Sequence, residues 1–201
     1  ITWCGNTTIN AIEPSNGLWQ ARTLQGETLQ AKTLIIAAGD QTRGFEQTNW
    51  IPLKAIRGQT SRIEQHNIIS AFSSLRRVIC GKGYVSPPTD EGVNLGATFT
   101  LHDNTAICNQ HDHEMNLRNL LALFSPRSTQ YQLIAKLLDD KQSIYELSGR
   151  VGFRAVSPDY LPIVGPVVDA DQFTHRYAAL RKSAKQRLSE AAPLLDNLFV
   201  F

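Results

Sequence analysis

The sequence predicts an α+β fold built on an antiparallel or mixed β-sheet, and three observations lead to this prediction. Short apolar or alternating runs come first along the chain and helical patterns come later. Few strands alternate with helices, as they would in a complete parallel α/β fold. No G-x-G-x-x-G motif occurs, so a complete dinucleotide-binding Rossmann fold is not expected.

The first strands are expected at residues 7–12, 18–23 and 28–37. Pro14-Ser15-Asn16-Gly17 and Gln25-Gly26-Glu27 separate these runs and are typical of hairpin turns. Residues 34–38 show no polar alternation, which predicts a strand buried on both faces. Gly39 then permits a tight turn or a close approach of the backbone.

Further strands are expected at residues 54–63, 76–80, 84–86, 93–99, 143–154 and 162–168, and helices at 112–124, 128–139 and 171–191. His111, Asp112 and His113 invite interpretation as a metal site. Residues two apart on a helix point to different faces, however, and no third ligand lies at a useful spacing. We therefore expect no metal, and Asp112 instead favours the start of a helix.

Composition limits the class of protein. The chain has 201 residues, 42% of them hydrophobic, which is enough to bury a sizeable core. No signal peptide or membrane-spanning run is visible, so a cytoplasmic location is expected. Cys4, Cys80 and Cys108 are widely spaced, which favours reduced thiols. The net charge of +2 does not by itself predict binding to nucleic acid.

Arg154 is the leading candidate for substrate binding. It lies among apolar residues in the run GRVGFRAVSPDYLPIVG, at residues 149–165. A guanidinium in a mostly apolar pocket could bind a carboxylate through two parallel hydrogen bonds. Alternatively, Arg154 pairs with Asp159 or another internal acid and holds a turn together. The local sequence leaves both interpretations open.

This run and the upstream run TLIIAAGDQTRGFEQTNWIPLKAIRGQ together resemble the FAD-dependent D-amino-acid oxidase and glycine oxidase superfamily. The resemblance implies that Arg154 anchors the substrate carboxylate. It also implies a set of cofactor-binding residues, namely Ala37, Ala38, Gly39, Arg57, Gly58 and Gln59. The alternative for the last three is a β-bulge beside a surface arginine.

Tyr84, in the block GKGYVSPP, would face the substrate or the flavin according to the same resemblance. A core tyrosine with one hydrogen bond is an equally good interpretation of this residue.

Within the superfamily, the blocks GKGYVSPP, GRVGFRAVSPDYLPIVG and LLDNLFVF are similar to the oxidoreductase domain of bifunctional enzymes that modify the wobble uridine of bacterial tRNA. The similarity implies FAD as cofactor, tRNA as partner and a separate methyltransferase part that uses S-adenosyl-L-methionine. The implied reaction removes the carboxymethyl group from 5-carboxymethylaminomethyl-(2-thio)uridine and leaves the 5-aminomethyl form.

The same similarity assigns residues 51–148, approximately, to a substrate domain of the D-amino-acid-oxidase type. Residues of about 1–50 and 149–201 would adjoin the FAD-binding domain, with an incomplete Rossmann portion. No glycine-rich phosphate loop is present, so the chain is expected to be the central part of the enzyme. By itself, the fragment is expected to lack FAD and to be inactive.

Two other functions remain open: a glycine- or sarcosine-type oxidase of the same superfamily, and a non-catalytic RNA-binding domain. A basic segment bears on any contact with RNA, because such a stripe could follow tRNA phosphates. A solvated basic helix face is the commoner explanation. The segment contains His175, Arg176, Arg181, Lys182, Lys185 and Arg187.

Overall fold

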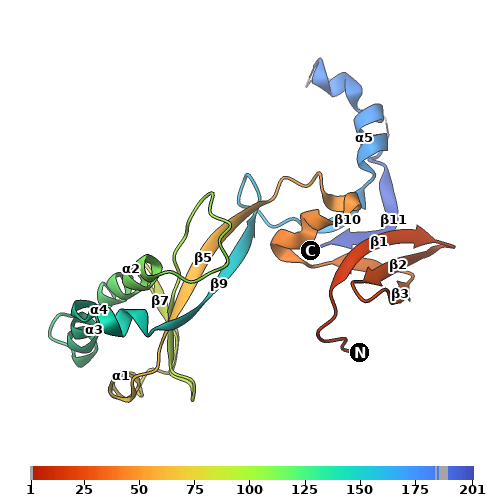
Figure 1. Cartoon of the computed structure of the whole chain (residues 1–201). Helices are drawn as coiled ribbons and strands as arrows, with labels where there is room; N and C mark the ends of the chain where they lie inside the picture. Colours follow the sequence, from red (N-terminus) through yellow and green to blue (C-terminus); the bar gives the residue numbers. More distant parts are fainter. Residues whose placement is uncertain (1, 184, 186–189) are drawn as a thin grey trace. The chain divides into compact units, whose positions relative to one another are not determined.

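The computed structural model describes residues 2–183, 185 and 190–201, and the chain forms two compact units (Figure 1). The first unit consists of Ile1–Lys54 with Ala155–Phe201, and the second of Ala55–Arg154. Helices combine with antiparallel and mixed sheets, so the α+β prediction is confirmed. No helix of the described residues is long and apolar enough to cross a membrane.

The first unit begins with a three-stranded antiparallel sheet. Its strands are β1 (Ile9–Ser15), β2 (Leu18–Thr23) and β3 (Thr28–Ala31), in that order. Asn16 and Gly17 join β1 to β2, and the pairing of Ser15 with Leu18 confirms the predicted hairpin. Trp19 is buried on β2, where it faces the core of this unit.

A second sheet of the same unit has the order β10-β11-β4. Its strands are β4 (Leu34–Ile36), β10 (Gly165–Val168) and β11 (Leu194–Val200). β11 runs parallel to β4 and antiparallel to β10, so the sheet is mixed. The single strand predicted over residues 28–37 is therefore wrong, because a bend at residues 32–33 carries the chain from one sheet to the other.

The prediction that residues 34–38 are buried on both faces is also wrong. Ile36 is 5% exposed, whereas its neighbour Ile35 is 62% exposed. In the part of the chain that the structure describes, β4 is an edge strand, and only the face with Ile36 is covered by the core. This core joins residues from both sheets and consists of Ile12, Trp19, Ala21, Ile36, Ile51, Val167, Leu198 and Val200.

Short helices complete the first unit: the 3₁₀ helices η1 (Gly39–Gly44), η2 (Glu46–Thr48) and η3 (Ala178–Arg181), and the α-helix α5 (Ala170–Arg176). The helix predicted over residues 171–191 is thus shorter, since Tyr177 ends α5 in a non-helical conformation.

The second unit is a five-stranded sheet of order β6-β7-β8-β5-β9. The strands are β5 (Lys54–Ile63), β6 (Ile79–Cys80), β7 (Tyr84–Val85), β8 (Val93–Gly96) and β9 (Ser148–Val156). β5 matches its predicted range. The strand predicted over residues 143–154 begins later, because a short helix occupies its first residues.

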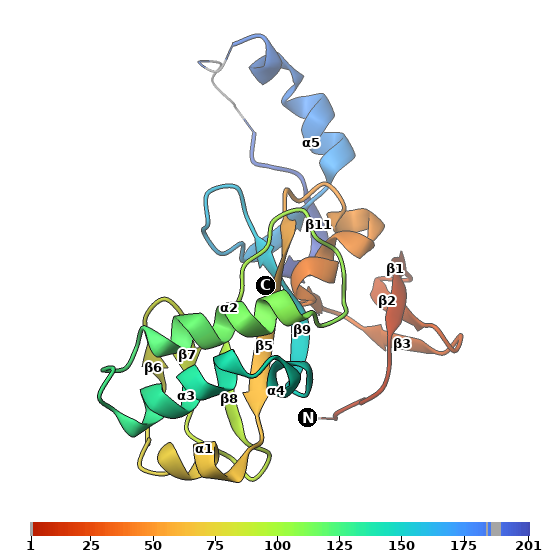
Figure 2. The same ribbon diagram turned by 60° about the vertical axis from the view of Figure 1, so that its left-hand side comes forward.

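Four helices pack against this sheet: α1 (His66–Ala71), α2 (Gln110–Leu121), α3 (Thr129–Asp139) and α4 (Lys141–Tyr145). Figure 2 shows α2 and α3 side by side, and α2 contacts β7 and β8. Leu117 and Leu120 of α2 meet Val85, Val93 and Leu95 in one apolar core. The sequence did not predict α1 and α4, because each is shorter than two helical turns and shows no helical periodicity.

A buried polar cluster also joins α2 to β5. Ser61 Oγ lies 2.7 Å from Nδ1 of His113, and Asn116 Nδ2 donates to Ser61 Oγ at 3.0 Å and to the Gln59 carbonyl at 2.9 Å. Burial lowers the pKa of His113, and the neighbouring Asp112 carboxylate opposes this effect more weakly. Burial thus favours the neutral form of His113 over the charged form.

We predict that this unit loses stability as the pH falls below about 6.5, the ordinary pKa of histidine. Below this pH, His113 binds a proton in the unfolded chain more readily than in the folded protein, so unfolding becomes more favourable. The thermal midpoint of unfolding should fall more between pH 7.5 and 5.5 in the wild type than in His113→Gln. The exposed neighbour provides the control, since His111→Gln should keep the wild-type pH dependence. Equal slopes in all three proteins would contradict the prediction.

Candidate functional site

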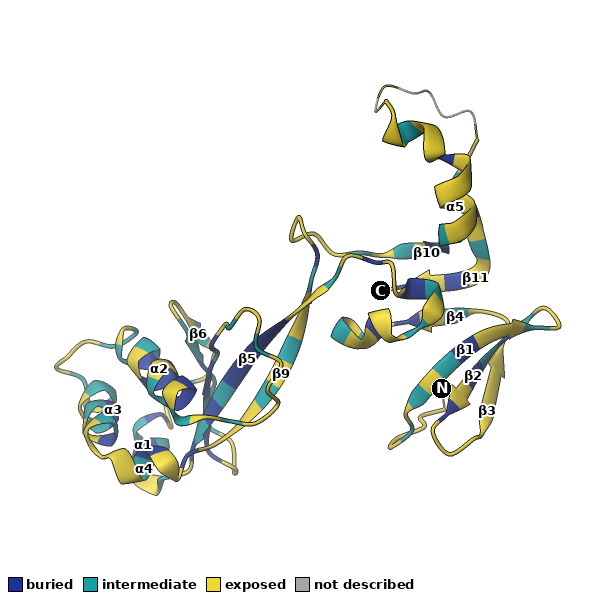
Figure 3. Ribbon diagram, turned by 45° about the horizontal axis from the view of Figure 1, so that its top comes forward, coloured by how far each residue is buried: buried dark blue, intermediate teal, exposed yellow. Residues whose placement is uncertain are grey.

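The Arg57-Gly58-Gln59 segment lies in the buried middle of β5 (Figure 3). Arg57 and Gln59 are both completely buried. The alternative of a surface arginine is therefore wrong. A buried guanidinium requires an anionic partner and hydrogen bonds, and the surroundings of Arg57 supply an anion and at least one bond for each of its nitrogens.

Arg57 is engaged through each of its three nitrogens. Its Nη1 forms an ion pair with Oδ2 of Asp112, a buried carboxylate on α2. Its Nε donates to the carbonyl of Thr105 at 2.7 Å, and its Nη2 donates to the carbonyl of Ile107 at 2.9 Å. Nη2 also reaches Oε1 of Gln59 at 3.2 Å. The arginine therefore binds the loop at residues 97–109, which connects β8 to α2.

Gln59 fixes the end of the same loop. Its Nε2 donates to the Asn109 carbonyl, and its Oε1 accepts from the Asn109 amide, both at 2.8 Å. Asn109 is the N-cap of α2, because its Oδ1 accepts from the Asp112 amide at 2.8 Å. Asp112 thus lies in the first turn of the helix, as predicted. The side chains of Arg57 and Gln59 form their hydrogen bonds within this network. Their implied role in binding the cofactor stays a prediction.

Gly58 is required by a close approach of two backbone segments. A Cβ atom at this position would lie 2.8 Å from the carbonyl oxygen of Thr98 and 3.4 Å from Nη1 of Arg154. Any larger residue would push the loop or the arginine away from β5. The glycine thus serves an internal contact of this unit.

Arg154 lies near the end of β9, the edge strand of the sheet, and is exposed. The sequence predicted a mostly apolar pocket around Arg154, but its side chain is exposed within this unit. Its guanidinium Cζ lies 5.5 Å from the ring centroid of Phe99, an arrangement suited to a cation–π contact. Within residues 55–154, Arg154 makes no hydrogen bond or ion pair, so its donors remain available.

Asp159, the suggested partner of Arg154, is engaged in its own turn. Its Oδ1 accepts from Ser157 Oγ at 2.9 Å and from the Leu161 amide at 3.1 Å. These bonds, the Leu161 amide first, lower the pKa of the Asp159 carboxyl. The carboxylate stabilises the turn that follows β9.

Tyr84 lies on β7 opposite Gly96 of β8 and is half-buried. Its hydroxyl makes no hydrogen bond with another described residue. The alternative of a core tyrosine with one hydrogen bond therefore finds no partner among these residues. Its suggested contact with substrate or flavin stays a prediction.

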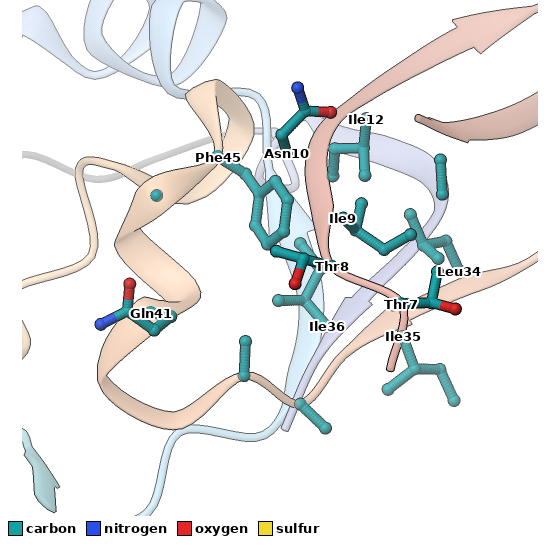
Figure 4. Close-up of a pocket in the computed structure, with 14 residues that line it drawn as sticks. Thr7, Thr8, Ile9, Asn10, Ile12, Leu34, Ile35, Ile36, Gln41 and Phe45 are labelled. Carbon is teal, nitrogen blue, oxygen red and sulfur yellow. The ribbon is translucent and has the colours of Figure 1, made fainter. Parts of the chain in front are cut away.

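Ala37 and Ala38 follow β4 and line an apolar pocket of about 710 Å³ in the first unit (Figure 4). Figure 4 shows Ile9 and Ile36 beside it, with Phe45 from the segment after η1. Gly39 opens η1 with a φ of +58°, a conformation that favours glycine. Apolar residues make up most of the lining, and no lysine or arginine lines the pocket to bind a pyrophosphate.

The basic segment is exposed where the structure describes it. Arg176 is partly engaged, since Nη1 lies 3.6 Å from Glu190 Oε2 and Nη2 donates to Gln172 Oε1 at 3.1 Å. Arg181, Lys182 and Lys185 are exposed, and Arg187 lies outside the described residues. Among the described residues, no three His, Cys, Asp or Glu side chains are grouped to hold a metal ion, and the three cysteines are free.

Sequence reasoning missed Phe99, which the structure places beside Arg154. It was assigned only to the end of a strand at residues 93–99, whereas β8 ends at Gly96. An aromatic residue in the mostly polar run TFTLHDNT was the available signal, because such a loop offers no core for a phenyl ring to enter.

Comparison with known proteins gives the chain a family. A family model described as FAD dependent oxidoreductase matches residues 2–182. The chain is 37% identical over 182 residues to the tRNA 5-methylaminomethyl-2-thiouridine biosynthesis bifunctional protein MnmC of Stutzerimonas stutzeri, covering 90% of this chain and 26% of that protein. It is also 37% identical to the protein of the same name from Chromobacterium violaceum, covering 94% and 27%. The chain thus spans about a quarter of the length of these relatives.

Solved structures show the same fold at low sequence identity. Glycine oxidase from Geobacillus kaustophilus is similar over 96% of this chain and 41% of its own length, with a TM-score of 0.55 and 16% identity. The fructosyl amine:oxygen oxidoreductase Amadoriase I from Aspergillus fumigatus is similar over 96% and 40%, with a TM-score of 0.58 and 14% identity. At these identities the comparison supports the fold alone.

We predict that Asp112→Ala destabilises the protein by about 3–5 kcal/mol, because it leaves the buried Arg57 charge without its main partner. Urea unfolding measures this change in the free energy of unfolding. Glu91→Ala is the control: it breaks the exposed Arg62–Glu91 pair, which is 2.8 Å long, and should cost at most about 1 kcal/mol. Equal effects of the two substitutions would show that the buried pair does not hold the loop.

Proposed function

Because the chain belongs to the FAD-dependent oxidoreductase family, we propose that it is part of an enzyme that oxidises a C–N bond on tRNA. The substrate would be the 5-carboxymethylaminomethyl group of a wobble uridine, with or without a 2-thio group. Similarity to MnmC proteins over nine-tenths of the chain supports tRNA as the substrate. In this proposal the second unit is the substrate domain, and the first adjoins the FAD-binding domain.

The observation that carries the proposal is the state of Arg154. Two arginines of the same sheet differ completely: Arg57 is buried with its donors used, whereas Arg154 is exposed, unpaired within its unit and held beside Phe99. A guanidinium with free donors is suited to bind a carboxylate through two hydrogen bonds. The carboxymethyl arm of the proposed substrate ends in such a carboxylate.

The proposed reaction is a two-electron oxidation followed by hydrolysis. The substrate carbon between nitrogen and carboxylate loses a hydride, the amine loses a proton, and a C=N bond forms. Water then adds to this imine, the C–N bond breaks, and the products are glyoxylate and 5-aminomethyluridine. FAD, when bound, accepts the hydride.

The chain's own residues would position the substrate rather than transfer protons. Arg154 would hold the carboxylate and so restrict the position of the reacting carbon. Ideal positioning of two reacting groups lowers an activation barrier by about 7 kcal/mol or more, and a single anchor supplies part of this. No side-chain base is required if the amine arrives neutral. Tyr84 would line the substrate or flavin face, while Ala37, Ala38 and Gly39 would form an apolar wall for the cofactor.

We predict that Arg154→Ala in the full-length, FAD-loaded protein lowers kcat/KM for tRNA bearing the carboxymethylaminomethyl group by on the order of a hundredfold or more. The reason is the loss of a charge-assisted, two-point contact. Glyoxylate release measures the reaction. Because the side chain is exposed, the thermal midpoint should hardly change.

The matched control is Arg150→Ala, which removes an exposed arginine from the same strand and should leave turnover close to wild type. Undiminished glyoxylate release by Arg154→Ala would exclude the anchoring role. A wild-type protein that oxidised free glycine or sarcosine but not tRNA would instead support the amino-acid oxidase alternative.

The exposed basic segment is proposed to contact tRNA phosphates. Replacing Arg181, Lys182 and Lys185 together by Gln should weaken tRNA binding and make its salt dependence shallower by about two units in log Kd against log salt. A filter-binding salt series measures both effects. The control replaces three exposed lysines elsewhere, Lys32, Lys54 and Lys141, by Gln. An identical salt slope for both triple variants would remove this segment from the interface.

A further inference from the structure

A second pocket, of about 680 Å³, lies within the second unit beside the Phe99–Arg154 pair. The loop at residues 97–109 and the first turns of α2 line it. Phe99 is 54% exposed there and does not belong to the apolar core of the unit. One side of its ring is occupied by Arg154. A large aromatic surface thus remains accessible in a pocket whose lining is more apolar than polar.

The charged residues of this pocket differ in how far they are already paired with other residues of the protein. Asp103 and Asp112 also line it, but Asp112 forms an ion pair with Arg57, and Asp103 Oδ2 lies 3.5 Å from Nε of the same arginine. Lys82 and His111 are exposed, and their side chains make no hydrogen bond with another described residue. One guanidinium faces two carboxylates, so the partly exposed Asp103 keeps negative charge in the pocket. The available groups are therefore an aromatic face, the side chains of Lys82 and His111, and an acceptor carboxylate, a combination that can stack a base and bind its polar edge.

We propose that Phe99 is the platform on which the uracil ring of the substrate stacks, with Lys82 beside its phosphate. This inference rests on the proposed function and names the part of the substrate that the pocket selects. A free amino acid would use Arg154 alone. A uridine that carries a carboxylate arm uses Phe99 and Arg154 together, so Phe99 determines specificity.

The spacing of the two residues fits such a substrate. Arg154 Cζ lies 5.5 Å from the Phe99 centroid. A base stacked on the far face, about 3.5 Å from the ring, lies about 9 Å from that carbon. The arm from C5 of uracil to the carboxyl carbon spans about 5 Å, and a guanidinium–carboxylate pair adds about 4 Å. Because the phenyl ring stands between a base on its far face and Arg154, the arm must pass the edge of the ring. An extended arm of this length does so only when the base is displaced toward that edge, the offset stacking that aromatic rings prefer.

The first test is binding of 5-carboxymethylaminomethyluridine 5′-monophosphate to the full-length protein, measured by calorimetry. Phe99→Leu keeps an apolar side chain but removes the ring, and should weaken binding by about 5- to 150-fold, the range for stacking on an aromatic residue. Phe99→Tyr should bind within about threefold of wild type. Phe173→Leu, which changes another partly exposed phenylalanine, should have no effect.

The second test compares turnover of the modified nucleotide with that of N-ethylglycine, which has a carboxylate and an amine but no base. Phe99→Leu should lower kcat/KM for the nucleotide only. Equal losses for both substrates would mean that Phe99 merely supports Arg154, and no loss of binding would likewise overturn the inference. If the wild type binds the nucleotide in a Phe99-dependent manner but releases no glyoxylate, the proposed function fails and the stacking role stands.

Discussion

The buried ion pair between Arg57 and Asp112 is the interaction on which the second unit depends. It lies between the middle of β5 and the first turn of α2, and the same guanidinium holds two carbonyls of the loop between β8 and α2. Taking both charges out of water is unfavourable, and the cost is offset because each of the three guanidinium nitrogens has a hydrogen-bond partner. The loop that presents Phe99 is fixed by that requirement.

The same strand explains why Arg154 is presented differently. Gly58 follows Arg57 directly, and the absence of a side chain there lets Thr98 and the Arg154 guanidinium approach the backbone of β5. One face of the strand therefore supports an internal network, while the contact at Gly58 brings a free cation beside an aromatic ring. Gly58, between the buried residues Arg57 and Gln59, thus makes room for Arg154, the candidate substrate-binding arginine, beside the structural Arg57.

In the first unit, the mixed sheet is covered by the core on only one face at β4. β4 pairs in parallel with β11, and its residue Ile36 lies in the core, whereas Ile35 on the other face is exposed. The pocket beside Ala37 and Ala38 lies at this edge. Since the chain spans about a quarter of the length of its MnmC relatives, the family's cofactor chemistry belongs to the whole protein.

The amino-acid sequence alone predicts the α+β class, the hairpin at Asn16-Gly17, the range of β5 and the two longer helices of the second unit, because these depend on local periodicity and turn chemistry. Its motifs also singled out Arg154. The three-dimensional contacts show that Arg57 is buried and structural and that Phe99 lies beside Arg154. Both outcomes depend on contacts between residues some 50 positions apart in the chain, such as Arg57 with Asp112, and no local pattern encodes such contacts. The turn at Asp159 is local, but the sequence left a pairing of Asp159 with Arg154 equally open.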